Sequence, residues 1–312
     1  MPFFLNAHVQ TLWAQAGKPL LPELDRHLLS LPDGRVITLY STLQAHAEQA
    51  TLVLPGLGGT HRSAYVRRII SALARRGHRV FFAQFQLLDH PLHSQNRIGT
   101  HAGDTEALDY IVNWLGRQNQ RQALNAVGYS LGGAALLNWL AQQGTAAPVR
   151  AAAAVSVPFD LALAEARLRQ GFSRVYQAYL LRCQKRQVVQ GWKACADASL
   201  RRQIMKAGNF ALFDDLVTAP MYGFASARAY YSRCSPRQAL GRVQVPTLLI
   251  HAADDPFMTP AAIPRPQELP APVQLDLRRH GGHVGFVHGL PWRPQYWLEE
   301  RIPAFLEQQT GS

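Results

Sequence analysis

The sequence is poor in cysteine, in acidic residues and in long apolar runs, and each shortage narrows what the protein can be. Its 312 residues include three cysteines, Cys183, Cys195 and Cys234, an odd set without CxxC spacing that fits a reducing compartment. No run reaches the roughly 18 apolar residues of a membrane-spanning helix. The first residues, MPFFLNAHVQTLW, lack the basic start of a secretory signal. We therefore expect a soluble, cytoplasmic protein.

The shortage of acidic residues leaves a formal net charge of +12, from 32 Lys and Arg against 20 Asp and Glu. Residues 165–206 carry 10 basic and 2 acidic residues, whereas residues 207–312 carry 9 of each. Such an excess attracts polyanions such as nucleic acid or anionic lipid. A solvated helical face gives the same pattern, so both interpretations stay open at this point.

Short strand-like runs alternate with helical patterns along most of the chain. A turn signal at Pro32-Asp33-Gly34, between HLLSL and RVITLYS, predicts an N-terminal hairpin. The later strand-like runs are TLVLP (51–55), RVFFAQF (79–85), ALNAVGYS (123–130), AAAAVSV (151–157), PTLLIHA (246–252) and VQLDLR (273–278). The helical patterns fall at 61–76, 104–118, 131–143 and 292–309. This alternation predicts an α/β fold, with a mostly parallel central sheet covered by helices on both faces.

One stretch interrupts the alternation. Residues 158–240 are mostly helical, polar and aromatic and contain no clear core strand. We therefore predict a core of residues 1–157 and 241–312 with a helical cap, residues 158–240, inserted after the sixth strand. Aromatic residues interleave with arginines in the cap: Phe172, Tyr176, Tyr179, Trp192, Tyr222, Phe224, Tyr230 and Tyr231. Such residues can stack on nucleic-acid bases, but we favour the lining of a pocket.

A serine stands between a predicted strand and a predicted helix, in Gly128-Tyr129-Ser130-Leu131-Gly132. A GxSxG motif in this context is typical of a nucleophile elbow, in which the serine is held on a sharp turn and small neighbours let strand and helix close together. The turn places the serine hydroxyl at a helix N-terminus, where the amide of Leu131 can face an oxyanion. A tight turn with an incidental serine is the alternative.

A serine hydroxyl needs a base to take its proton and an acid to orient that base. In this architecture the acid and then the histidine follow the serine, each after a strand. Asp254 or Asp255 can serve as the acid, and we favour Asp255, with Asp254 bracing the turn. Among the histidines we favour His283 as the base, because two glycines let the chain turn back toward the serine, and we assign His280 a structural role.

The loop Pro55-Gly56-Leu57-Gly58-Gly59 is expected to supply the second oxyanion donor, and the amide of Leu57 is our candidate. The glycines form neither a Walker loop nor a GxGxxG motif. His90 and His93 lack a carboxylate cluster, so we read them as a loop pair and not as metal ligands. No metal and no organic cofactor is expected.

Several long motifs together resemble the YheT-type α/β-hydrolases, the AB hydrolase 4 family of esterases. They are NAHVQTLW, the glycine loop with Ser63-Ala64-Tyr65, VGYSLGG, GFSRVYQAYLL, FDDLVTAPMYGFASARAYY, HAADDPFM and HGGHVGF. The resemblance implies an α/β-hydrolase fold and assigns nucleophile, acid and base to Ser130, Asp255 and His283. Two stretches depart from the family pattern: Pro55-Gly56 replaces His-Gly, and residues 86–91 lack the usual Arg-Gly pair.

The sequence therefore predicts a serine esterase that cleaves short-chain acyl esters, with lipid or phospholipid esters implied by the resemblance. A thioesterase or amidase on the same scaffold is the alternative enzyme, and Ser130 argues against an epoxide hydrolase. The rival from another class is a non-catalytic binder of nucleic acid or of a membrane surface. Because the charge lies mainly in the predicted cap, we expect it to favour anionic substrates or peripheral contact with anionic lipid, and we expect no nucleic-acid partner.

Overall fold

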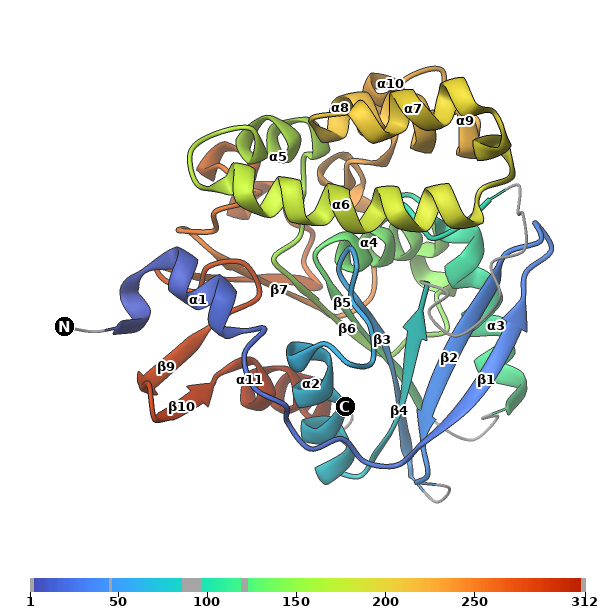
Figure 1. Ribbon diagram of the computed structural model, residues 1–312. Coiled ribbons are helices and arrows are strands. Elements are labelled where there is room, and N and C mark those ends of the chain that lie inside the picture. Colours follow the sequence, from blue (N-terminus) through green and yellow to red (C-terminus); the bar gives the residue numbers. More distant parts are fainter. Residues whose placement is uncertain (1–2, 45–46, 86–96, 119–122, 310–312) are drawn as a thin grey trace.

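The computed structural model describes residues 3–44, 47–85, 97–118 and 123–309. Eight strands form one sheet in the order β1-β2-β4-β3-β5-β6-β7-β8 (Figure 1). They are β1 (Leu24–Ser30), β2 (Val36–Thr42), β3 (Gln49–Leu54), β4 (His78–Gln84), β5 (Ala123–Tyr129), β6 (Ala151–Val155), β7 (Thr247–Ala252) and β8 (Val273–Arg278). Strands β3 to β8 are parallel, and only β2 runs antiparallel to both of its neighbours. The predicted α/β class, with a mostly parallel sheet, is confirmed.

Helices cover both faces of the sheet (Figure 1). On one face, α2 (Ala64–Arg75) packs with α11 (Leu298–Gln308), and on the other α3 (Thr105–Gln118) packs with α4 (Leu131–Gln143). Apolar side chains spaced three or four residues apart place one face of α2 on the sheet. The central strands are buried on both sides, so they read as continuous apolar runs such as AAAAV in β6.

The chain between β6 and β7 adds a group of helices on the side of the sheet where the parallel strands end (Figure 1). They are α5 (Leu161–Leu168), α6 (Ser173–Gly191), α7 (Ala198–Lys206), α8 (Phe210–Phe213), α9 (Ala219–Tyr222) and α10 (Ala227–Cys234). Side chains including Leu181, Trp192 and Ile204 form a small apolar core inside this group. Among the helices that the structure describes, none has the length and apolar character needed to cross a bilayer.

The C-terminal part differs from the sequence prediction. The helix expected over 292–309 begins only at Leu298, because Arg293–Tyr296 is a strand, β10, paired with β9 (Val287–Leu290). Pro294 lies in β10, in a two-stranded sheet where both strands are edges and a proline is tolerated. Gly289, with φ of 85°, lets the two strands form a separate small sheet.

Near the other end of the chain, a short helix, α1 (Ala7–Trp13), begins at Asn6. The side chain of Asn6 accepts hydrogen bonds from the amides of His8 and Val9, which is the usual way of capping a helix start. The motif NAHVQTLW therefore forms a capped helix.

Candidate active site

Ser130 sits on the turn between β5 and α4. Its backbone has φ of 48° and ψ of −117°, a conformation that costs a non-glycine residue free energy and must be held by its surroundings. The amide of Ser130 donates to the carbonyl of Val155 on the neighbouring strand, at 2.8 Å. A Cβ atom on Gly128 would lie 2.6 Å from the Cα atom of Gly133, so strand and helix meet at a distance that only glycine permits. This is the geometry expected of a nucleophile elbow.

The structure brings Ser130, His283 and Asp255 into one hydrogen-bonded chain. Nε2 of His283 lies 3.0 Å from Oγ of Ser130, and Nδ1 of His283 lies 2.9 Å from Oδ2 of Asp255. Because an ionised carboxylate can only accept, Nδ1 carries the ring proton. Nε2 is then free to accept the serine proton, which is the orientation that a general base requires.

The side chains of Asp255 and His283 are shielded from water. Asp255 is 4% exposed and His283 is 8% exposed. Oδ1 of Asp255 accepts from the amide of Phe257 at 2.8 Å, which fixes the carboxylate. The Phe257 ring stacks on the His283 ring at 3.9 Å between centroids and 1° between planes. The sequence does not predict this stack, although the run Asp255-Pro256-Phe257 places Phe257 close to Asp255.

Asp254, the other candidate acid, points to a different task. Its Oδ1 accepts from the amides of Gly281 and Gly282, at 3.0 and 2.9 Å, and its Oδ2 lies 3.2 Å from Nδ1 of His280. Asp254 therefore braces the turn that carries the histidine, as predicted, and His280 is the partner of that brace.

A further histidine was not foreseen. His251 in β7 is fully buried, and its Nε2 lies 4.0 Å from Oδ2 of Asp255, too far for a hydrogen bond. Burial lowers the pKa of His251, because the charged ring would lose its hydration. His251 is therefore neutral at physiological pH and adds no second positive charge beside the acid.

The two predicted oxyanion donors both line the cavity that contains Ser130. A Cβ atom on Gly56 would lie 3.1 Å from Cβ of Ser130, which shows how closely the glycine loop approaches the serine. The hydroxyl of Tyr65 accepts from the amide of Gly56 at 3.0 Å and so holds this loop. Leu131 is the first residue of α4, where the backbone amides have no hydrogen-bond acceptor within the helix.

A cavity of about 140 Å³ extends from Ser130 between the sheet and the helices α5 to α10, which are called the cap helices below. Most of its wall is apolar, and α5, α6 and α8 contribute residues such as Leu161, Leu168, Leu180, Phe210 and Phe213. Ser130 therefore lies in a pocket whose apolar wall suits a hydrocarbon group.

The side chains of His101, Glu165 and Asp214 also line the cavity. Burial lowers the pKa of His101 to about 4, so its ring is neutral at physiological pH. Burial raises the pKa of Asp214 to about 6, and its carboxylate accepts hydrogen bonds from the hydroxyls of Tyr231 and Thr218. These contacts tie Asp214 to α10, so its role in the packing of the cap helices is clear from the structure.

The aromatic residues of the predicted cap divide among several environments. Tyr230 and Tyr231 line the cavity, as expected. Trp192 packs in the apolar core of the cap helices instead. Phe172 and Tyr179 are exposed on or beside α6. Pocket lining therefore describes only part of the aromatic set.

Two sequence features lie outside the described residues. They are the pair His90 and His93 and the departure from the family pattern at residues 86–91. Elsewhere, within the described ranges, no three His, Cys, Asp or Glu side chains gather as metal ligands would.

Comparisons with known proteins point to one family. The sequence model for the alpha/beta hydrolase fold matches residues 51–290. "Putative esterase YheT" of Escherichia coli (strain K12) is 38% identical over 312 residues, which cover 97% of this chain and 91% of that protein. "Phospholipase ABHD3" of Mus musculus is 30% identical over 263 residues, which cover 83% of this chain and 63% of that protein.

Solved structures share the fold. The esterase Pf2001 of Pyrococcus furiosus matches with a TM-score of 0.59 and 15% identity, over 94% of this chain and 99% of that one. A bacterial membrane phospholipase A matches with a TM-score of 0.56 and 16% identity, over 98% of this chain and 90% of that one. At such low identity these likenesses concern the fold alone.

Proposed function

The chain belongs to the α/β-hydrolase family, and from that premise we propose that it is a serine hydrolase that cleaves carboxylic esters. The observation that carries the proposal is the chain of contacts from Asp255 through His283 to Ser130, at 2.9 and 3.0 Å. The strained backbone of Ser130 and the adjacent apolar cavity support it. The name of the relative from Escherichia coli points to the same activity.

The proposed reaction passes through an acyl-serine. His283 takes the proton of Ser130 as Oγ attacks the ester carbonyl, and the amides of Leu57 and Leu131 donate to the oxyanion that forms. His283 then gives that proton to the departing alcohol. Water enters, loses a proton to His283 and attacks the acyl group, and the carboxylic acid leaves as Ser130 recovers its proton. Asp255 keeps the ring oriented and stabilises its charged form.

The size of the cavity limits the acyl group. A volume of about 140 Å³ compares with the roughly 150 Å³ apolar cavity that takes up benzene in another protein. A hydrocarbon chain on the order of six carbons therefore fits, which favours short acyl esters. A longer lipid ester requires that part of the molecule stay outside the cavity.

Labelling with a fluorophosphonate probe tests the proposal, because the probe reacts only with an activated serine. We expect the wild-type protein to be labelled and Ser130→Ala and His283→Ala to remain unlabelled, with circular dichroism confirming that all three are folded. Folded wild-type protein that resists the probe would falsify the assignment. Para-nitrophenyl esters of increasing chain length then measure the acyl preference.

A thioesterase or amidase uses the same residues, so the nature of the leaving group distinguishes these enzymes. We expect kcat/KM to be higher for an oxygen ester than for the thioester or amide with the same acyl group. If the thioester or amide is cleaved faster, the protein is a hydrolase of that other class.

A further inference from the structure

The helix α1 packs directly on the loop that carries His283. This loop, residues 279–286, is strained: Val284 has φ of 65° and Phe286 has φ of 48°. Positive φ is a costly conformation for a β-branched or bulky residue, and it persists only where neighbouring groups hold it. The contacts of this loop therefore decide where the His283 ring lies.

Thr11 of α1 holds the backbone of His283 itself. The amide of His283 donates to Oγ1 of Thr11 at 2.9 Å, and the same hydroxyl donates to the carbonyl of Ala7 at 2.8 Å. Thr11 is 7% exposed, so water does not compete for this contact. The hydroxyl thereby links one turn of α1 to the peptide unit of the histidine.

Gln10 holds the end of the loop in the same way. Its Oε1 accepts from the amide of Val287 at 2.6 Å, and its Nε2 donates to the carbonyls of Val287 and Phe4, at 2.9 and 2.7 Å. Gln10 is 2% exposed. Its amide thus pairs with both backbone groups of the residue that follows the strained segment.

The glycines of the loop make this close packing possible. A Cβ atom on Gly285 would lie 2.6 Å from the carbonyl oxygen of Gln10, and one on Gly282 would collide with the carbonyl oxygen of Ala7. The glycines are therefore required both for the turn of the loop and for the approach of the α1 backbone.

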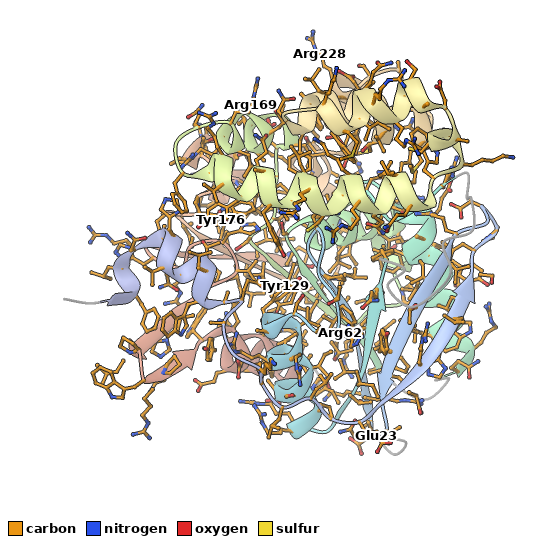
Figure 2. All side chains as sticks on the ribbon, viewed as in Figure 1. Glu23, Arg62, Tyr129, Arg169, Tyr176 and Arg228 are labelled. Atoms are coloured by element: carbon orange, nitrogen blue, oxygen red, sulfur yellow. The ribbon has the colours of Figure 1, made fainter. Side chains whose placement is uncertain are left out.

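A second route connects α1 with the histidine through the cap. Tyr176 of α6 lies on the side of that helix that faces α1 (Figure 2), and its hydroxyl lies 3.1 Å from Nδ1 of His8. The Tyr176 ring is 5.1 Å from the ring of Phe257, which stacks on His283. The position of α1 is thus coupled to the catalytic ring from two sides.

We propose that α1 is a positioning element for the base, with Thr11 and Gln10 as its positioning residues. The inference rests on the proposed function, because it assigns Thr11 and Gln10 a part in holding His283 between Asp255 and Ser130. Neither residue lines the cavity that contains Ser130. Their contribution is to keep Nε2 within reach of the serine hydroxyl, and displacement of a catalytic group by about 1 Å can cost on the order of 100-fold in rate.

The test compares Thr11→Val, which keeps the shape but removes the hydroxyl, with Thr11→Ser, which restores it. We expect kcat on a short para-nitrophenyl ester and the rate of fluorophosphonate labelling to fall about 10- to 100-fold in Thr11→Val. KM should stay within about twofold, since the cavity wall is unchanged. Thr11→Ser should recover most of the lost rate, and Gln10→Met should reproduce the loss at a second position.

Thr51→Val is the matched control, because Thr51 is also fully buried and its hydroxyl contacts Nδ1 of His78 at 2.8 Å, near the opposite end of the sheet. Thr11→Val loses the two hydrogen bonds of its hydroxyl and Thr51→Val loses one, so a general loss of stability would lower kcat in both variants. An equal loss of kcat in Thr11→Val and Thr51→Val, or an unchanged kcat in Thr11→Val, overturns the inference. The proposed function is unaffected by either result as long as the wild-type protein is active. An inactive, unlabelled wild type instead contradicts the proposed function.

Discussion

Two adjacent aspartates at the end of β7 make contacts of different kinds. Asp255 contacts the imidazole of His283 and is almost fully buried. Asp254 accepts two backbone hydrogen bonds from the turn before that histidine. The first arrangement fixes the tautomer and orientation of the His283 ring, and the second fixes the shape of the loop.

Substituting asparagine for each of the two aspartates is expected to affect kcat very differently. In Asp255→Asn the amide can donate to the ring and favour the wrong tautomer, so we expect kcat to fall about 10⁴-fold with little change in thermal stability. In Asp254→Asn the side-chain oxygen still accepts from Gly281 and Gly282, so we expect kcat within about tenfold of wild type. Steady-state kinetics with melting curves for both variants check this. If kcat falls further in Asp254→Asn than in Asp255→Asn, the roles assigned to the two aspartates are wrong.

At the scale of elements, the turn from β5 into α4 depends on the absence of side chains. Gly128, Gly132 and Gly133 allow the strand and the helix to meet, because a Cβ atom on any of them would lie under 3 Å from backbone or side-chain atoms. The strained φ of Ser130 is maintained by this packing.

Gly128→Ala tests this dependence, because its Cβ atom would lie 2.8 Å from the carbonyl oxygen of Gly132. We expect a loss of about 1–3 kcal/mol in the free energy of unfolding and a fall in kcat, as the serine shifts. Gly116→Ala is the matched control: Gly116 lies inside α3 with open space around its Cα, so alanine there should stabilise by about 0.5–1 kcal/mol. Chemical denaturation measures both, and an unchanged Gly128→Ala contradicts the packing argument.

The elements that can be predicted well from the sequence are those whose conformation depends on residues close together in the chain. The buried strands read as apolar runs, and the GxSxG turn needs its glycines, so the fold class and the position of Ser130 on its turn could be predicted from the sequence. The stack of Phe257 on His283 and the contact of Thr11 with the His283 amide join residues distant in the chain or dependent on rotamers. No local pattern encodes such contacts. The short strand Arg293–Tyr296 is likewise not predicted, because it directly precedes a helix and its sequence reads as part of that helix.

At the scale of the whole molecule, the excess of positive charge lies away from the candidate site. The segment 165–206, with 10 basic and 2 acidic residues, contains the whole of α6 and α7. Arg169 and Arg228 point away from the sheet at the outer edge of the cap helices (Figure 2). A groove between α6 and α7 is lined by Arg182, Lys185 and Arg186, with no acidic side chain among the described residues that line it.

This groove predicts attachment to an anionic lipid surface, since each basic residue near such a surface contributes about 1 kcal/mol. We expect the protein to sediment with vesicles of phosphatidylserine and phosphatidylcholine, but not with phosphatidylcholine alone, and to be released by salt. Arg182→Gln with Arg186→Gln should weaken this binding by about 2 kcal/mol. Arg75→Gln with Arg117→Gln changes the charge equally, but at the ends of α2 and α3, and should have little effect. Equal weakening in both double variants would reduce the attraction to net charge alone, and binding to neither vesicle would leave the basic face of the cap as a solvated surface.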